Sequence, residues 1–89
     1  MSFEWYKSIE KIKDKLSERG YASYKQEIAE RELAGSMFSE ILLGVCSKLM
    51  EIKIQNQQAY NQIREEADEL IAYSISIGLY PRPTNLSEN

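Results

Sequence analysis

Apolar positions recur along most of the chain at the three- and four-residue spacing of an amphipathic α-helix, and no stretch of β-type alternation interrupts them. This pattern predicts an all-α, single-domain antiparallel four-helix bundle with helices over residues 3–19, 24–34, 37–54 and 57–77. Residues 1–80 would form the bundle and residues 81–89 an extended or frayed tail. The expected core positions are Trp5, Ile9, Ile12 and Leu16, then Tyr24, Ile28 and Leu33, then Phe38, Ile41, Leu42, Val45, Leu49 and Ile52, and finally Tyr60, Ile63, Ala67, Leu70, Ile71, Ser74 and Ile77.

Glycines and prolines mark the expected helix ends. Gly20 and Gly78 are placed to take the left-handed conformation that closes a helix, and Gly35 ends the second helix. Pro81 and Pro83 prevent the last helix from continuing. These signals divide the chain everywhere except between the third and fourth helices.

The connection over residues 53–58 contains neither glycine nor proline, and the apolar spacing continues across it. A single helix over residues 36–77 would be about 63 Å long and would need a partner subunit to cover it. We favour a break near Asn56, a residue type that tolerates left-handed geometry, and therefore a compact monomer over a long-helix dimer. The third helix is the most apolar segment, which predicts a central position in the bundle.

The chain has no histidine and one cysteine, so it lacks the side chains on which most catalytic and transition-metal sites depend. A di-iron bundle of the usual form needs two inward Glu-x-x-His pairs and is excluded. Cys46 lies within the apolar stripe of the third helix, where inert packing is expected. The composition therefore predicts a non-enzymatic protein with no catalytic residue, cofactor or metal.

Charge and hydropathy narrow the class of partner. The net charge is −3, and in residues 57–80 Arg64 stands alone against four carboxylates, so nucleic-acid binding is disfavoured. The longest apolar stretch, residues 41–46, is too short to span a bilayer, and residues 1–5 contain no apolar run of secretory type. We expect a cytoplasmic protein without a membrane span.

An acidic flank lies beside the core stripe of the predicted fourth helix. One interpretation is a solvated face, neutralised in part by the lysines of the first helix. The other is a docking surface for a basic protein partner, with carboxylates that steer the encounter and tyrosines that supply buried area. The candidate partner-binding residues are Gln62, Glu65, Glu66, Glu69, Tyr73 and Tyr80.

Two segments resemble small bacterial four-helix immunity proteins. They are Gly35-Ser36-Met37-Phe38-Ser39-Glu40-Ile41-Leu42, with Leu49 following, and Glu69-Leu70-Ile71-Ala72-Tyr73 through Ser76-Ile77-Gly78-Leu79-Tyr80. Together they cover about a third of the chain, and the tyrosine-pair motif of nuclease-colicin immunity proteins is missing. The resemblance implies a cytoplasmic immunity or antitoxin-like inhibitor that binds and neutralises a cognate toxin, and it transfers no binding residue by motif.

Two other functions stay open from the residues alone. A structural or adaptor homodimer would associate through exposed apolar surface of the third helix. A small-molecule-binding bundle would need a cavity that periodicity does not reveal.

Overall fold

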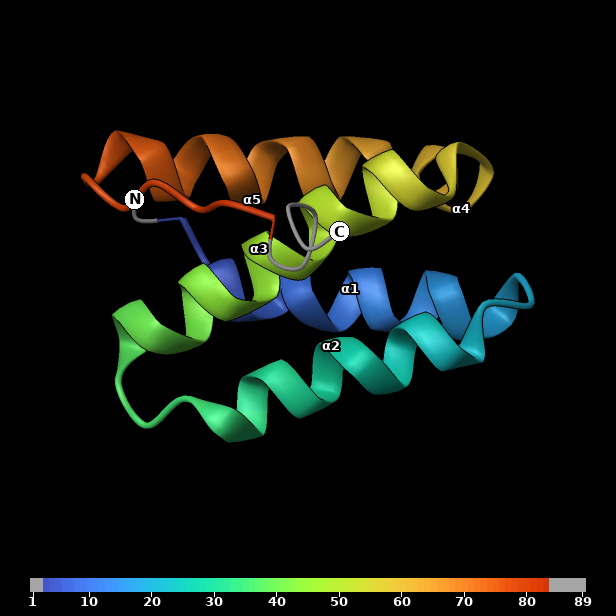
Figure 1. Cartoon of the computed structure of the whole chain (residues 1–89), viewed down its shortest axis with the longest axis horizontal. Coiled ribbons are helices and arrows are strands. Elements are labelled where there is room, and N and C mark those ends of the chain that lie inside the picture. The colour runs from blue at the N-terminus through green and yellow to red at the C-terminus, as the bar shows by residue number, and fades with distance from the viewer. Residues whose placement is uncertain (1–2, 84–89) are drawn as a thin grey trace, which may run out of the picture.

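Five helices make up the part of the chain that the computed structural model describes, residues 3–83 (Figure 1). They are α1 (Trp5–Glu18), α2 (Ala22–Ala34), α3 (Phe38–Gln55), α4 (Gln57–Gln62) and α5 (Arg64–Ser76). No strand occurs between residues 3 and 83, so the all-α class is confirmed. The sequence predicts four helices and the structure has five, because the helix expected over 57–77 is divided at Ile63.

The four longer helices run in alternating directions along the chain (Figure 1). α1 packs against α2 and α5, and α3 packs against the same two helices as well as against α4. α3 supplies five fully buried core residues, which agrees with its expected central position; these are Leu42, Val45, Cys46, Leu49 and Ile52. The other fully buried apolar residues are Ile9, Ile12, Leu16, Ile28, Ala59, Tyr60, Ile63, Ala67 and Leu70.

The break between α3 and α4 falls at Asn56, as predicted, but its geometry differs from the expected one. Asn56 has φ −149° and ψ 89°, which is not left-handed. Its side-chain Oδ1 instead accepts a hydrogen bond from the Ala59 N–H at 3.1 Å, which makes Asn56 the N-cap of α4. The cap satisfies a backbone donor that the interrupted helix would otherwise leave open, so the rod-like single helix does not form.

The second division, at Ile63, has no glycine, proline or capping side chain. The Ile63 N–H donates to the Tyr60 carbonyl at 2.9 Å, three residues back, so the last turn of α4 is tightened. α5 then starts with the Ala67 N–H bonded to the Ile63 carbonyl at 2.8 Å. The Ile63 side chain is fully buried at this joint, so core packing accompanies the division of the helix.

Both expected left-handed glycine caps are confirmed. Gly20 has φ +90° and Gly78 has φ +89°. After each of them the next residue bonds back over the helix end, with Tyr21 N–H to the Leu16 carbonyl at 2.8 Å and Leu79 N–H to the Ser74 carbonyl at 2.9 Å. The ends of α1 and α5 are therefore set by local chemistry.

Three residues expected in the core are exposed. Leu33 is 85% exposed because it lies five residues after the buried Ile28, about 140° around the helix from it. Ile77 is 43% exposed because α5 ends one residue before it. Phe38, the first residue of α3, is 40% exposed and packs against Trp5 with ring centroids 5.0 Å apart.

A network of ion pairs joins α2 to α3 inside the molecule. Lys48 Nζ lies 2.5 Å from Glu27 Oε1 and 3.3 Å from Glu51 Oε1, and Arg31 Nη2 lies 3.3 Å from Glu51 Oε2. Glu51 is only 1% exposed. Burial by itself lowers the pKa of Lys48, but the carboxylates of Glu27 and Glu51 outweigh burial and raise that pKa above its usual value. The network keeps buried charges compensated at the α2–α3 contact.

Glycine is required at Gly35 but not at Gly44, which gives a matched pair of substitutions. A Cβ on Gly35 would lie 2.8 Å from the Ile41 backbone nitrogen, whereas a Cβ on Gly44 would meet Arg31 at an ordinary 3.6 Å. We expect Gly35→Ala to lower the free energy of unfolding by about 1–3 kcal/mol. Gly44→Ala, inside α3, should raise it by about 0.5–1 kcal/mol. Urea denaturation of both variants measures the difference, and equal midpoints would contradict the close approach at Gly35.

After α5 the chain continues without helix and lies against α3. Pro81 is buried, and the Ser47 hydroxyl donates a hydrogen bond to the Arg82 carbonyl. This part of the expected tail over 81–89 is therefore attached to the bundle. Residues 84–89 lie outside the described residues.

Candidate functional site

Glu66, one of the predicted partner-binding residues, lies against α1 and is 8% exposed. Its Oε2 is 2.6 Å from Lys15 Nζ. Burial raises the pKa of the Glu66 carboxyl, but the Lys15 ammonium outweighs burial and the pKa is lowered from its usual 4.5. At neutral pH the pair is ionised and ties α1 to α5. If the flank is a solvated face, lysines of the first helix are expected to neutralise part of its charge. The Lys15–Glu66 ion pair is a contact of this kind.

Gln62 and Tyr73 also lie on the α1 side of the molecule. The Arg19 guanidinium donates to Gln62 Oε1 at 3.0 Å. Tyr73 is half-buried, and its ring centroid lies 4.8 Å from that of Phe3. Tyr73 of α5 therefore packs on the segment that precedes α1, and Gln62 of α4 is bonded to the residue that follows α1.

The remaining three predicted residues are exposed, but they do not form one patch. Tyr80, 69% exposed, follows α5 and borders a shallow hollow on α3 with Leu43 and Gly44. Glu65 and Glu69 lie one turn apart on the outward face of α5, and neither forms an ion pair within residues 3–83. The structure thus leaves Glu65 and Glu69 as free surface charge. It brings Gln62, Glu65 and Glu66 together around a polar hollow between α1 and the α4–α5 segment, which Lys15 and Arg19 also line.

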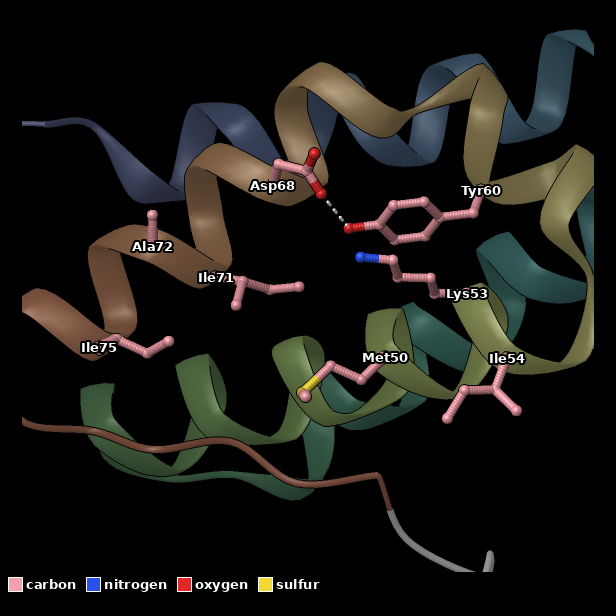
Figure 2. A pocket seen from close by; sticks show the side chains of 8 residues that line it. All are labelled: Met50, Lys53, Ile54, Tyr60, Asp68, Ile71, Ala72 and Ile75. Atoms are coloured by element: carbon pink, nitrogen blue, oxygen red, sulfur yellow. Dashed lines mark hydrogen bonds between the residues drawn. The ribbon is translucent and has the colours of Figure 1, made fainter.

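A groove lies between α3 and α5 (Figure 2). Glu65 and Glu69 do not line it, but each precedes a lining residue of α5, Asp68 or Ala72, by three residues. The groove is open to solvent and has a volume of about 370 Å³. Ile54 is 60% exposed and Ile75 is 46% exposed, and they lie at opposite ends of the groove in Figure 2. The lining is predominantly apolar and consists of Met50, Lys53 and Ile54 of α3, Tyr60 of α4, and Asp68, Ile71, Ala72 and Ile75 of α5.

One end of the groove is polar and is organised around Tyr60. The Tyr60 hydroxyl donates to Asp68 Oδ1 at 2.6 Å. Burial and the Asp68 carboxylate raise the pKa of Tyr60 above its usual 10, so the phenol stays protonated and remains the donor. Lys53 Nζ lies 5.4 Å from the Tyr60 ring centroid, and Arg64 Cζ lies 5.5 Å from it. Both cations near the groove are therefore placed over one aromatic ring.

Sequence reasoning missed this groove. Ile54 and Ile75 fall outside the apolar stripes that predict the core, and both are exposed beside the groove. The available signal was that Ile54 follows Met50, and Ile75 follows Ile71, by four residues, so each helix carries a second apolar row beside its core stripe. Their convergence depends on how α3 and α5 pack, which helical spacing alone does not give.

Cys46 has the environment expected of a packed core thiol. It is fully buried, and its Sγ lies 3.8 Å from the Leu70 carbonyl oxygen to which it donates. Burial raises the pKa of the thiol to about 12, so the thiolate is not populated at neutral pH. The Cys46 thiol therefore acts as an apolar packing group in the core.

Between residues 3 and 83, no group of three or more acidic or cysteine side chains is arranged to hold a metal ion. None of the five helices combines the length and apolar character needed to cross a bilayer. Comparisons with known protein families, curated proteins and solved structures find no match to this chain.

Proposed function

We propose that this protein is a non-enzymatic protein-binding module that contacts its partner through the outward face of α5 and the adjoining α3–α5 groove. The observation that carries the proposal is that α5 exposes the unpaired carboxylates of Glu65 and Glu69 on the same helix that, with α3, forms a groove lined by the exposed Ile54 and Ile75. Interfaces use apolar anchors for affinity and surrounding charge for encounter rate and specificity. In line with the sequence resemblance, the module acts as a cytoplasmic immunity or antitoxin-like inhibitor of a toxin with a basic surface.

The test is a pair of charge-reversal variants with the same change in net charge. Glu65→Lys with Glu69→Lys reverses the α5 face, and Asp14→Lys with Glu30→Lys reverses two exposed acids on α1 and α2. A partner is recovered from the native host with the tagged wild-type protein and identified by native mass spectrometry. We expect the α5 variant to associate with it about tenfold more slowly, with a weaker dependence on salt.

The control variant should associate at nearly the wild-type rate. If the two variants slow association equally, the effect reflects net charge and the α5 face is not the contact surface. Glu66 is left unchanged in both, because its ion pair with Lys15 contributes to the α1–α5 contact.

A homodimer is the second candidate function, and the start of α3 favours it. Met37 is 61% exposed and Phe38 is 40% exposed, and Phe38 packs on the half-buried Trp5. Sedimentation at low micromolar concentration separates the two candidates. A dimer that Phe38→Ser dissociates supports the homodimer, and a monomer supports the binding module.

A further inference from the structure

We propose that the occupant of the α3–α5 groove is an amphipathic helix of the partner protein, with an apolar face in the groove and basic residues directed at Glu65 and Glu69. This inference rests on the proposed protein-binding function and specifies the partner's chemistry. Helix-in-groove recognition places apolar side chains spaced i, i+3 or i+4, and i+7 against an apolar floor.

The dimensions of the groove suit about two turns of a helix. On α5 the lining extends from Asp68 to Ile75, which is about 10 Å of helix length. Both walls are helices, and the apolar lining residues Met50, Ile71 and Ala72 lie between the exposed Ile54 and Ile75. An incoming helix can therefore bury apolar residues on successive turns against both walls.

The charges around the groove select a basic helix. Glu65, Asp68 and Glu69 lie on α5, and none of them forms an ion pair within the described residues 3–83. The facing cations are Lys53 of α3 and Arg64 at the start of α5, and both lie over the Tyr60 ring. Of these charges, only Lys53 and Asp68 line the groove itself. The exposed charges of α5 are three carboxylates against Arg64, with Lys15 and Arg19 on the α1 side of Glu65, so the acidic part is the outward face of α5 next to the groove.

A small apolar ligand fits the groove less well. Binding sites for such ligands enclose most of the ligand surface. Here the apolar residues at the two ends, Ile54 and Ile75, are themselves about half exposed, so the groove does not enclose its contents. The Tyr60 hydroxyl and Asp68 are already bonded to each other, which removes the clearest pair of polar groups for orienting a ligand.

The experiment uses synthetic peptides and the full chain. The probe is a fluorescently labelled, side-chain-stapled peptide of about 15 residues with leucines on one face and lysines beside them. A second peptide has glutamate in place of each lysine, and a third has the same composition as the first with the leucines dispersed around the helix. Fluorescence anisotropy measures binding of each peptide at low salt and at physiological salt.

We expect the basic amphipathic peptide to bind at least about tenfold more tightly than either control peptide. Ile54→Ser with Ile75→Ser should weaken its binding about tenfold, because these variants remove the apolar anchors. Leu33→Ser removes an exposed leucine of α2 and should leave binding unchanged. Circular dichroism melting of each variant checks that the fold is intact.

Three results would overturn the inference. They are equal binding of the basic and acidic peptides, unchanged binding by the Ile54/Ile75 variant, and displacement of the peptide by micromolar laurate, which would assign the groove to a small apolar ligand. The host partner separates the two proposals. If the α5 charge-reversal variant loses this partner and the Ile54/Ile75 variant still binds it, the proposed function stands and the groove is rejected as the docking site. If the peptide binds in the groove but the protein captures no host partner, the groove stands as a helix-binding site and the proposed function is rejected.

Discussion

Glu51→Gln is expected to lower the free energy of unfolding by about 3 kcal/mol, because it removes the charge that compensates two cations inside the molecule. Glu51 is 1% exposed and lies 3.3 Å from both Lys48 Nζ and Arg31 Nη2. This loss of stability is at the lower end of the range expected when a buried ion pair is broken, because Lys48 keeps its contact with Glu27. Urea denaturation followed by circular dichroism measures the change at pH 7.

Glu30→Gln is the matched control, because Glu30 is an exposed glutamate of α2. It should change stability by less than about 0.5 kcal/mol. A double-mutant cycle with Lys48→Met isolates the pair, and the double variant should be less destabilised than the sum of the single variants. If Glu51→Gln matches the control, the buried network does not stabilise the α2–α3 contact.

Alkaline pH is expected to produce the other large loss of stability. The pKa of Cys46 is raised from 9.0 to about 12 by burial, and the pKa values of Tyr60 and Lys48 are raised from 10.0 and 10.5. A raised pKa in the folded state means that stability is complete below the unfolded pKa and is lost as pH rises toward the folded pKa. The thiol alone accounts for about 4 kcal/mol between pH 9 and pH 12.

The thiol dominates the pH dependence between pH 9 and pH 10, because the unfolded-state pKa values of Tyr60 and Lys48, 10.0 and 10.5, lie at or above the top of this window. In this window the free energy of unfolding of the wild-type protein should fall with a slope approaching about 1.4 kcal/mol per pH unit. Cys46→Ala should be less stable at pH 7 and should show a much flatter profile up to pH 10. The same slope in both proteins would show that the thiol does not set the alkaline limit.

The acidic side of the profile follows from the opposite shift. The Glu66 pKa is lowered, so its contribution is present at neutral pH and is lost as pH falls below 4.5. The chain contains no histidine to titrate between these limits. The stability profile should therefore be nearly flat from about pH 6 to pH 8.

The fate of the predicted acidic flank shows where helical periodicity stops being informative. Glu65, Glu66 and Glu69 are neighbours on one helix, and spacing alone places them on a common outer surface. The structure turns Glu66 toward Lys15, 51 residues earlier in the chain, and leaves Glu65 and Glu69 exposed. Which side of an acidic helix becomes surface depends on the helix that packs beside it.

The sequence by itself determined the all-α class, the left-handed caps at Gly20 and Gly78, the position of the break at Asn56 and most of the core. These features rest on interactions between residues a few positions apart, which periodicity and capping report directly. Only the tertiary structure decided the groove between α3 and α5, the Glu66–Lys15 pair, the buried Glu51 and the close approach at Gly35. Each of these features depends on how segments distant in the sequence pack together, and the spacing of residues within one helix does not determine that packing.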